Sequence, residues 1–213
     1  GTVGVLGTNN GKGAASVAWN IKVQAVRVLG WDGGDLSDLE DGIRWAAGIQ
    51  VPGASPEVNS APASIINLSL GMRAPCPKSL QAAIDAVAQR ALVVVAAGNS
   101  GQDASLEAPA NCKNVLVVAA TDNQARLASF SNYGQTVKLS APGVQVLSAV
   151  KGGYAYYNGT SMAAPHVAGV AALVRGRYPA LTPAQVTQRL YDGAKTITCS
   201  KPCGRLLDAG VAK

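Results

Sequence analysis

Apolar runs and amphipathic stretches alternate along most of the chain. Residues 92–97 and 115–120 are continuously apolar, which is typical of strands buried on both faces of a parallel sheet. Residues 35–49 and 79–90 place their apolar side chains three and four positions apart, as amphipathic helices do. Strands that alternate with helices predict a three-layer α/β fold, with a mostly parallel sheet covered by helices on both faces. Further strands are expected at 23–29, 65–70, 137–139 and 144–149.

Two short stretches carry residues that are typical of helix starts. Thr182-Pro183-Ala184-Gln185 fits a capping box with proline at the first helical position, and it predicts a helix that runs to about Tyr191. Ser37-Asp38-Leu39-Glu40 fits the same box near the start of the helix at 35–49. Pro, Ser, Ala and Gly dominate residues 52–62, so this segment is expected to form a loop.

The stretch from Asn158 to Gly169 places a nucleophile-type residue, Ser161, between a glycine and a long apolar helix pattern. The first N–H groups of a helix have no backbone partner, and with the positive end of the helix dipole they suit a developing anion. Acyl-transfer chemistry needs such surroundings for its serine. The alternative is that Ser161 only caps the helix, which is a common use of serine.

Polar and small residues follow two of the predicted strands. Gly98-Asn99 comes directly after one strand, and Ser69-Leu70-Gly71 ends another. Ligands of parallel α/β sheets bind beyond the carboxyl ends of the strands, so both stretches lie where a substrate would bind. The Asn99 side chain can donate an N–H to an oxyanion, with the backbone N–H of Ser161 as a second donor. Asn after Gly is also a common turn, and this structural use of Asn99 stays open.

Three segments resemble, in the right order, motifs of the subtilisin-like serine proteases (subtilases). Gly159-Thr160-Ser161-Met162-Ala163-Ala164-Pro165-His166-Val167-Ala168-Gly169 resembles their nucleophile signature. Residues 66–71 resemble the strand that lines the substrate cleft, and residues 93–101 resemble the segment with the oxyanion-hole asparagine. The resemblance extends from Gly1 to about Ala194. It implies a subtilisin-like fold and a secreted, monomeric serine endopeptidase that cleaves polypeptides through an acyl-enzyme on Ser161, with Asn99 in the oxyanion hole.

The resemblance also implies a substrate pocket and a calcium site. The walls of the pocket for the residue before the cleaved bond would be Ser69, Leu70 and Gly71 on one side and Ala96, Ala97 and Gly98 on the other. The first of these walls would also pair with an extended substrate as an added strand. A structural calcium ion would bind the glycine-rich loop at 7–13, where Asn10 would supply a side-chain oxygen. A simple Asn-Gly turn is the alternative at Asn10.

Serine catalysis by a triad also needs a histidine base and a carboxylate that orients it. The only histidine, His166, lies five residues after Ser161, well off the same face of a helix. No aspartate stands in the Asp-[Ser/Thr]-Gly setting of the subtilases, and Asp32-Gly33-Gly34 is the nearest match. In that family both motifs precede the position of Gly1.

We therefore expect residues 1–213 to be one subtilisin-like peptidase domain that is N-terminally incomplete and inactive by itself. Its catalytic His and Asp would lie on an upstream segment or a separate chain. The alternative is a catalytically dead, subtilase-like domain that only binds peptides. An α/β-hydrolase esterase is excluded, because its histidine should come well after the serine.

The composition indicates an oxidising environment and argues against nucleic acid and membrane as partners. An even count of cysteines fits an oxidised, secreted protein. Four cysteines allow three pairings, and the sequence alone does not choose among them. We favour a small disulfide loop between Cys199 and Cys203, because their spacing is short, with Cys76 then paired to Cys112. A metal site is the alternative, but the chain lacks the C-x-x-C pair or nearby His that it would need. The net charge of +6 comes from scattered Lys and Arg with few aromatic residues, which argues against nucleic-acid binding. No apolar run is long enough to span a membrane.

Overall fold

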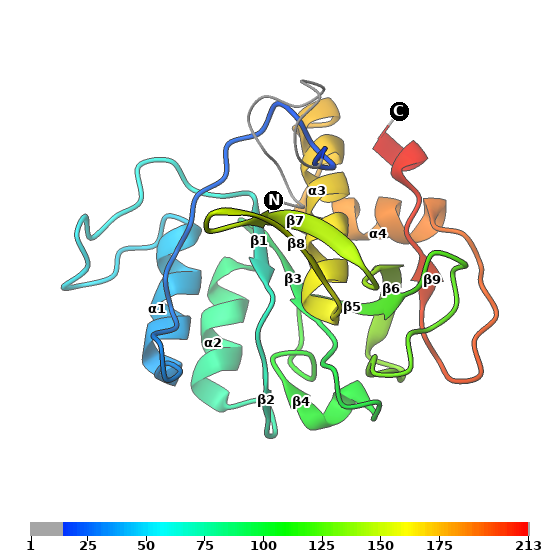
Figure 1. Ribbon diagram of the computed structural model, residues 1–213. Helices are drawn as coiled ribbons and strands as arrows, with labels where there is room; N and C mark the ends of the chain where they lie inside the picture. The colour runs from blue at the N-terminus through cyan, green and yellow to red at the C-terminus, as the bar shows by residue number, and fades with distance from the viewer. Residues whose placement is uncertain (1–14, 213) are drawn as a thin grey trace.

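The computed structural model describes residues 15–212, and its centre is a five-stranded parallel sheet (Figure 1). The strand order is β1-β3-β5-β6-β9, and every neighbouring pair is parallel. These strands are β1 (Ile65–Leu68), β3 (Leu92–Ala96), β5 (Val115–Thr121), β6 (Val137–Pro142) and β9 (Arg205–Leu206). The four helices of the described residues are α1 (Leu36–Ala46), α2 (Lys78–Val87), α3 (Thr160–Arg177) and α4 (Pro183–Gly193).

Both faces of the sheet are buried under helices. In β3, Val93 and Val95 belong to the hydrophobic cluster that contains the apolar residues of α1 and α2. Val94, between them, belongs to the opposite cluster with α3 and α4. All five residues of β3 are buried, so an uninterrupted apolar sequence fits this strand. The predicted arrangement, a mostly parallel sheet with helices on both faces, is confirmed.

Two small antiparallel pairs accompany the main sheet. Strand β2 (Met72–Arg73) pairs with β4 (Glu107–Ala108), which follows a short 3₁₀ helix at Ala104–Leu106. Strands β7 (Val146–Val150) and β8 (Gly153–Tyr157) form a hairpin just before α3. The predicted strand at 144–149 is therefore present, but it pairs within this hairpin and not with the main sheet. A last 3₁₀ helix covers Ala209–Ala212.

The prediction of a strand at 23–29 is wrong. This segment pairs with no strand within residues 15–212. Val26 and Val28 pack on the hydrophobic cluster of α1 and α2, and Gly42 of α1 leaves room for Val28, because a Cβ there would clash with its side chain. Val23 and Leu29 are 63% and 49% exposed. The apolar residues of this segment are thus explained by the packing of some of them on the cluster. They do not indicate hydrogen bonds to a neighbouring strand.

One of the two capping boxes is present. Thr182 accepts a hydrogen bond from the backbone N–H of Gln185, whose side chain reaches back to the Thr182 backbone, as predicted. The box at 37–40 is wrong: α1 begins at Leu36, with Asp35 as its N-cap and no side-chain cap bond. Ser37 already lies inside the first turn, so its position excludes the capping role.

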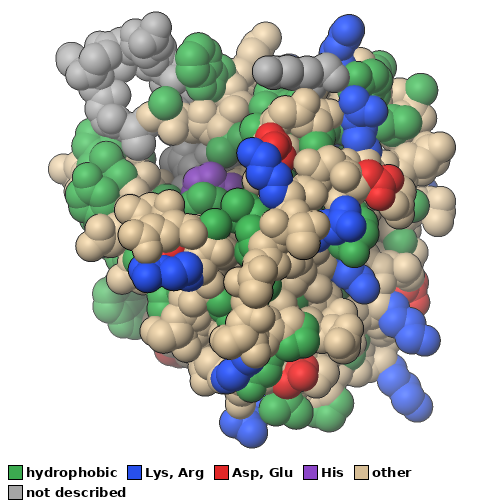
Figure 2. Space-filling model, turned by 90° about the vertical axis from the view of Figure 1, so that its right-hand side faces the viewer, with side chains coloured by type: hydrophobic (Ala, Val, Ile, Leu, Met, Phe, Trp, Pro, Cys, Tyr) green, Lys and Arg blue, Asp and Glu red, His purple; other side chains and the backbone are tan. Residues whose placement is uncertain are grey.

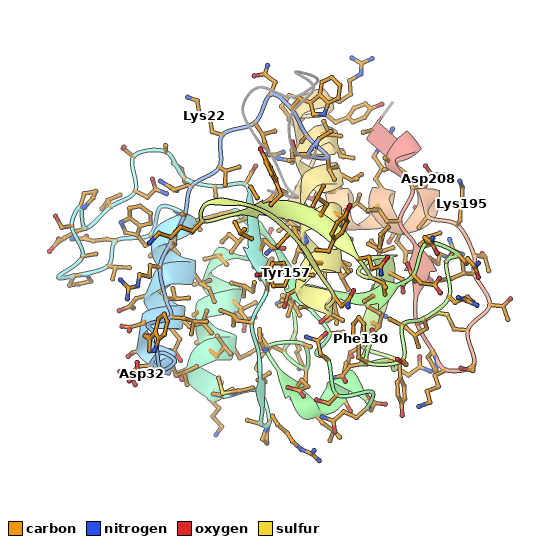
Figure 3. All side chains as sticks on the ribbon, in the orientation of Figure 1. Lys22, Asp32, Phe130, Tyr157, Lys195 and Asp208 are labelled. Carbon is orange, nitrogen blue, oxygen red and sulfur yellow. A yellow bond between two sulfur atoms is a disulfide. The ribbon has the colours of Figure 1, made fainter. Side chains whose placement is uncertain are left out.

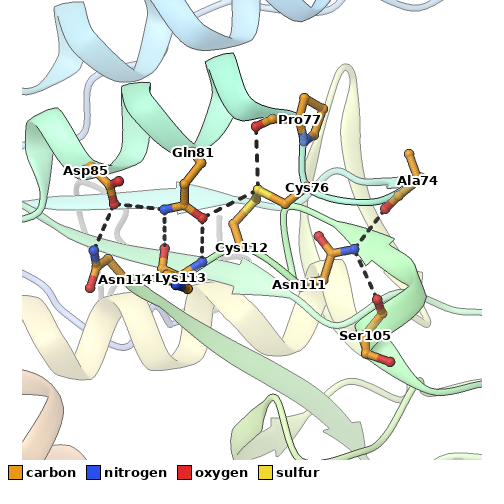
Figure 4. Close-up of a disulfide and its surroundings, with 10 residues drawn as sticks. All are labelled: Ala74, Cys76, Pro77, Gln81, Asp85, Ser105, Asn111, Cys112, Lys113 and Asn114. Carbon is orange, nitrogen blue, oxygen red and sulfur yellow. Dashed lines mark hydrogen bonds between the residues drawn. A yellow bond between two sulfur atoms is a disulfide. The ribbon is translucent and has the colours of Figure 1, made fainter.

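Both predicted disulfides are present. Cys76–Cys112 spans 36 residues and joins the start of α2 to the segment before β5, while Cys199–Cys203 closes a small loop before β9. Beside the first disulfide, Gln81 of α2 accepts from Lys113 N at 2.8 Å and donates to Lys113 O at 3.2 Å (Figure 4). A covalent bond and two hydrogen bonds therefore hold α2 against this segment.

No helix within residues 15–212 is long and apolar enough to cross a membrane.

Candidate active site

Ser161 is the second residue of α3, and the N-cap position before that helix belongs to Gly159. The serine is half-buried, and its hydroxyl does not cap the helix. Ser161 Oγ donates to Ser69 O at 3.3 Å, and Ser69 Oγ donates to Ser161 O at 3.0 Å. The hydroxyl of Ser161 is thus turned toward the end of β1 and is not used to cap the helix.

Thr160 joins the start of α3 to the end of β3. Asn99 Oδ1 accepts two hydrogen bonds, from Thr160 N at 2.8 Å and from Thr160 Oγ1 at 2.9 Å. Gly98 N donates to Thr160 Oγ1 at 3.1 Å. Because the carbonyl oxygen of the Asn99 side chain is fully engaged, its amide group is fixed in direction.

The side-chain nitrogen of Asn99 and the backbone nitrogen of Ser161 lie near the same point. A Cβ on Gly159 would lie 3.6 Å from both Asn99 Nδ2 and Ser161 N, and 3.4 Å from Met162 Sδ. Neither of these two N–H donors has a hydrogen-bond acceptor in the part of the chain that the structure describes. Two unpaired N–H donors near one point can both bind the same oxyanion.

Asn132, which the sequence analysis missed, holds the loop that carries Asn99. It is fully buried, and its Nδ2 donates to Ala97 O at 2.9 Å. Its Oδ1 accepts from Ser100 N at 3.0 Å and from Gln102 N at 3.1 Å. Asn132 thus binds the backbone on both sides of Asn99. No sequence pattern signals this role, because Ser-Asn-Tyr-Gly reads as an ordinary surface turn.

The six predicted wall residues lie beyond or at the ends of two neighbouring strands. Strands β1 and β3 are adjacent and parallel, so the segments 69–71 and 96–98 come out at the same edge of the sheet. Ala96 and Ala97 are buried, Ser69, Leu70 and Gly98 are half-buried, and Gly71 is exposed. The hydrogen bonds between Ser69 and Ser161 place the nucleophile candidate beside this edge.

His166 has its own partner within α3. Its Nδ1 lies 2.9 Å from Met162 O, the carbonyl one turn earlier. Burial lowers the pKa of His166, and the hydrogen bond with Met162 O opposes this effect. Among the described residues no hydrogen bond joins its ring to Ser161. The geometry agrees with a structural use of this histidine.

Asp32 lies apart from the start of α3. It is exposed, in the loop before α1. Figure 3 shows it at one edge of the molecule, well separated from Tyr157, which ends β8 four residues before Ser161. Within residues 15–212, neither the histidine nor this aspartate completes a triad with Ser161.

The predicted calcium ligand Asn10 lies outside the described residues. Between residues 15 and 212, no group of three or more His, Cys, Asp or Glu side chains is arranged to hold a metal ion. Calcium therefore stays a prediction, and no chemical step is derived from it.

The basic residues are dispersed. Figure 2 shows Lys and Arg side chains scattered over one face of the molecule among apolar and neutral ones, without a continuous basic patch on that face. The net charge of +6 is thus not concentrated on this face.

Comparisons with known proteins show which family this chain belongs to. A model of the subtilase family matches residues 1–205. An extracellular protease of Xanthomonas campestris pv. campestris is 48% identical over 216 residues, which cover 96% of this chain and 37% of the relative. The extracellular basic protease of Dichelobacter nodosus is 48% identical over 183 residues, covering 82% of this chain and 30% of that protein. This chain therefore spans only 37% and 30% of the lengths of these relatives.

Two solved structures are also similar. Proteases from Pseudoalteromonas arctica include a chain that superposes with a TM-score of 0.94 at 41% identity, covering 100% of this chain and 68% of that one. A cold-adapted subtilisin-like serine proteinase superposes with a TM-score of 0.80 at 36% identity, covering 91% of this chain and 69% of its own.

Proposed function

Since the chain belongs to the subtilase family of serine proteases and has the subtilisin-like fold, we propose that it is the nucleophile-bearing part of a secreted, monomeric serine endopeptidase. The observation that carries this proposal is that Asn99 Nδ2 and Ser161 N lie near one point, each 3.6 Å from the position of a Cβ on Gly159. Secretion is supported by two disulfides and by relatives that are named extracellular proteases.

The mechanism that this geometry supports is acyl transfer. Ser161 Oγ attacks the carbonyl carbon of the peptide bond, and its proton passes to a histidine base. The oxygen of the tetrahedral intermediate accepts hydrogen bonds from Asn99 Nδ2 and Ser161 N, and the closeness of both nitrogens to one point supports this role. The base returns the proton to the leaving amine, and water then hydrolyses the ester on Ser161. Segments 69–71 and 96–98 hold the residue before the cleaved bond.

An upstream segment or separate chain supplies the histidine and the aspartate in this proposal. Strand β1 supports it, because in the described residues β1 pairs with β3 on one side and with no strand on the other. Asn67 of β1 also has a buried Oδ1 without a hydrogen-bond partner. Buried acceptors are rarely left unpaired, so a donor from a segment outside residues 15–212 fits this oxygen. It would lie close to Ser69 and Ser161.

A fluorophosphonate probe tests the proposed function. In the complete protease it is expected to label Ser161, and peptide mapping identifies the modified residue. Labelling of a different residue would contradict the proposal. The alternative, a catalytically dead domain that only binds peptides, predicts peptide binding without any labelling.

Asn99→Leu is expected to lower kcat by about 10²–10³-fold with little change in KM, a magnitude transferred from the corresponding donor of subtilisin. Asn99→Asp is a second variant, which keeps the oxygen that accepts from Thr160. It replaces the N–H donor with a carboxylate oxygen whose charge repels the oxyanion, so its loss in kcat should be at least as large. Steady-state kinetics on a peptide substrate measure both. Asn123→Leu, at an exposed position, serves as the control. A loss confined to KM would exclude the oxyanion role.

A further inference from the structure

Strand β4 (Glu107–Ala108) contacts both predicted walls of the substrate pocket. A Cβ on Gly71 would lie 3.2 Å from Ala108 O, and a Cβ on Gly98 would lie 3.2 Å from Glu107 Cγ. Strand β4 is also paired with β2, which begins directly after Gly71. The two walls therefore share β4 as a neighbour, so a residue of β4 can contribute to a pocket formed between them.

Glu107 brings a carboxylate to this end. The residue is only 9% exposed. Its Oε1 accepts a hydrogen bond from Gln102 Nε2 at 3.0 Å, while Oε2 accepts none from any described residue. Oε2 is not fully enclosed by protein atoms, so it remains open to solvent or a ligand. A buried carboxylate that is only half paired is costly, so its retention needs a reason.

No cation of the described residues neutralises Glu107. The ion pairs between residues 15 and 212 join Arg44 to Asp41, Arg126 to Asp122 and Lys195 to Asp208, the last of them labelled in Figure 3. Arg73 stands opposite Glu107 in the β2–β4 pair, but its side chain is exposed and forms no ion pair with the carboxylate. A cationic group from outside the described residues, such as a ligand, can therefore pair with the carboxylate of Glu107.

The carboxylate is held in a fixed direction. Gln102, its hydrogen-bond donor, is bound through its own backbone N–H to Asn132 Oδ1 at 3.1 Å. Asn132 also binds Ala97 O, next to Gly98, at 2.9 Å. One buried asparagine therefore sets the wall and, through Gln102, the orientation of Glu107 relative to that wall.

We propose that Glu107 determines the specificity of the pocket, and that the protease prefers lysine or arginine as the residue before the cleaved bond. This inference rests on the proposed function. A lysine or arginine side chain reaches past apolar surface along its methylene groups and carries its charge at the end. Its ammonium or guanidinium group would pair with Glu107 Oε2 in a charge-assisted hydrogen bond. An apolar side chain leaves the buried carboxylate unpaired, and the pocket therefore selects against it.

The test compares kcat/KM on peptide substrates that differ only before the cleaved bond, with Lys, Arg, Leu or Phe there. The complete protease is used, together with Glu107→Gln, which keeps the size of the side chain and removes its charge. Wild type is expected to favour Lys and Arg over Leu and Phe. Glu107→Gln should lose about 10–10²-fold on Lys and Arg, the range of one hydrogen bond to a charged group, and should gain activity on Leu and Phe, because no buried charge is then left unpaired. Glu57→Gln, in the exposed loop before β1, is the matched control.

The outcomes separate this inference from the proposed function. Cleavage of Leu and Phe substrates without preference for Lys or Arg would overturn the role of Glu107 and leave Ser161 as the nucleophile. An unchanged preference in Glu107→Gln would overturn it as well. Failure of the complete protease to react with a fluorophosphonate probe at Ser161 would instead overturn the proposed function. Should Glu107→Gln fail to fold, the wild-type preference decides, because a pocket that favours apolar residues contradicts the inference.

Discussion

Replacing Ser161 with alanine is expected to lower kcat by about 10⁶-fold, a magnitude transferred from removal of the nucleophile in subtilisin. The acyl-enzyme cannot form without Oγ, whereas the donors on Asn99 and the backbone of residue 161 remain. Substrate binding should change little, because the wall segments 69–71 and 96–98 are untouched. The oxyanion hole and binding alone should leave about 10³–10⁴-fold acceleration over water, again by analogy with proteases of this type.

The measurement needs two controls. Steady-state kinetics and fluorophosphonate labelling are carried out on the complete protease and on Ser161→Ala, and labelling should vanish with the activity. Ser37→Ala, at an exposed site in α1 without a capping role, should behave as wild type. Activity of Ser161→Ala close to that of the unchanged enzyme, or persistent labelling, would show that another residue is the nucleophile.

Much of the fold could be predicted because single segments carry the information. The continuous apolar residues of β3 can only be buried on both faces, and the box at Thr182 needs only four neighbouring residues. The strand at 23–29 could not be judged in this way, because a strand depends on a partner that the segment itself does not reveal. The same holds for β7, whose sequence predicts a strand but not its antiparallel partner β8.

The residues of the candidate site also differ in whether a single segment carries the information about them. Ser161 and Asn99 stand in contiguous motifs, so the sequence alone suffices to propose them as site residues. Asn132 and Glu107 were missed because their surroundings come from segments far along the chain. Asn132 acts through backbone bonds to residues more than thirty positions away, at Ala97 and Ser100. In the sequence Ser-Leu-Glu-Ala, Glu107 looks like an exposed residue. In the structure it belongs to β4, which pairs with β2, and it is buried.

Residues 1–213 by themselves are expected to hydrolyse no peptide, and activity should require an upstream segment that carries the histidine and the aspartate. A serine hydroxyl is a weak nucleophile at neutral pH without a base beside it. His166 is not such a base in this geometry, since its Nδ1 lies 2.9 Å from Met162 O and, among the described residues, its ring forms no hydrogen bond with Ser161. The open side of β1 should also make this chain prone to aggregate by itself.

Loss of activity through misfolding must be separated from loss through the missing base. The chain is refolded alone and together with the upstream segment, and each sample is assayed with a peptide substrate after circular dichroism and gel filtration. The segment need not be covalently joined, because a strand that pairs with β1 could hold it in place. Activity should appear only in the mixture, and a segment whose histidine is replaced by alanine should restore the fold without the activity.

His166→Ala supplies the opposing test. In the active mixture this variant should keep a functional nucleophile, and any loss should follow from the stability of α3, because the imidazole pairs with the helix backbone. Full activity of residues 1–213 alone, abolished by His166→Ala, would overturn both the need for an upstream segment and the structural use of His166. The catalytic base would then lie on the same helix as Ser161, and the geometry at the start of α3 would have to rearrange when substrate binds.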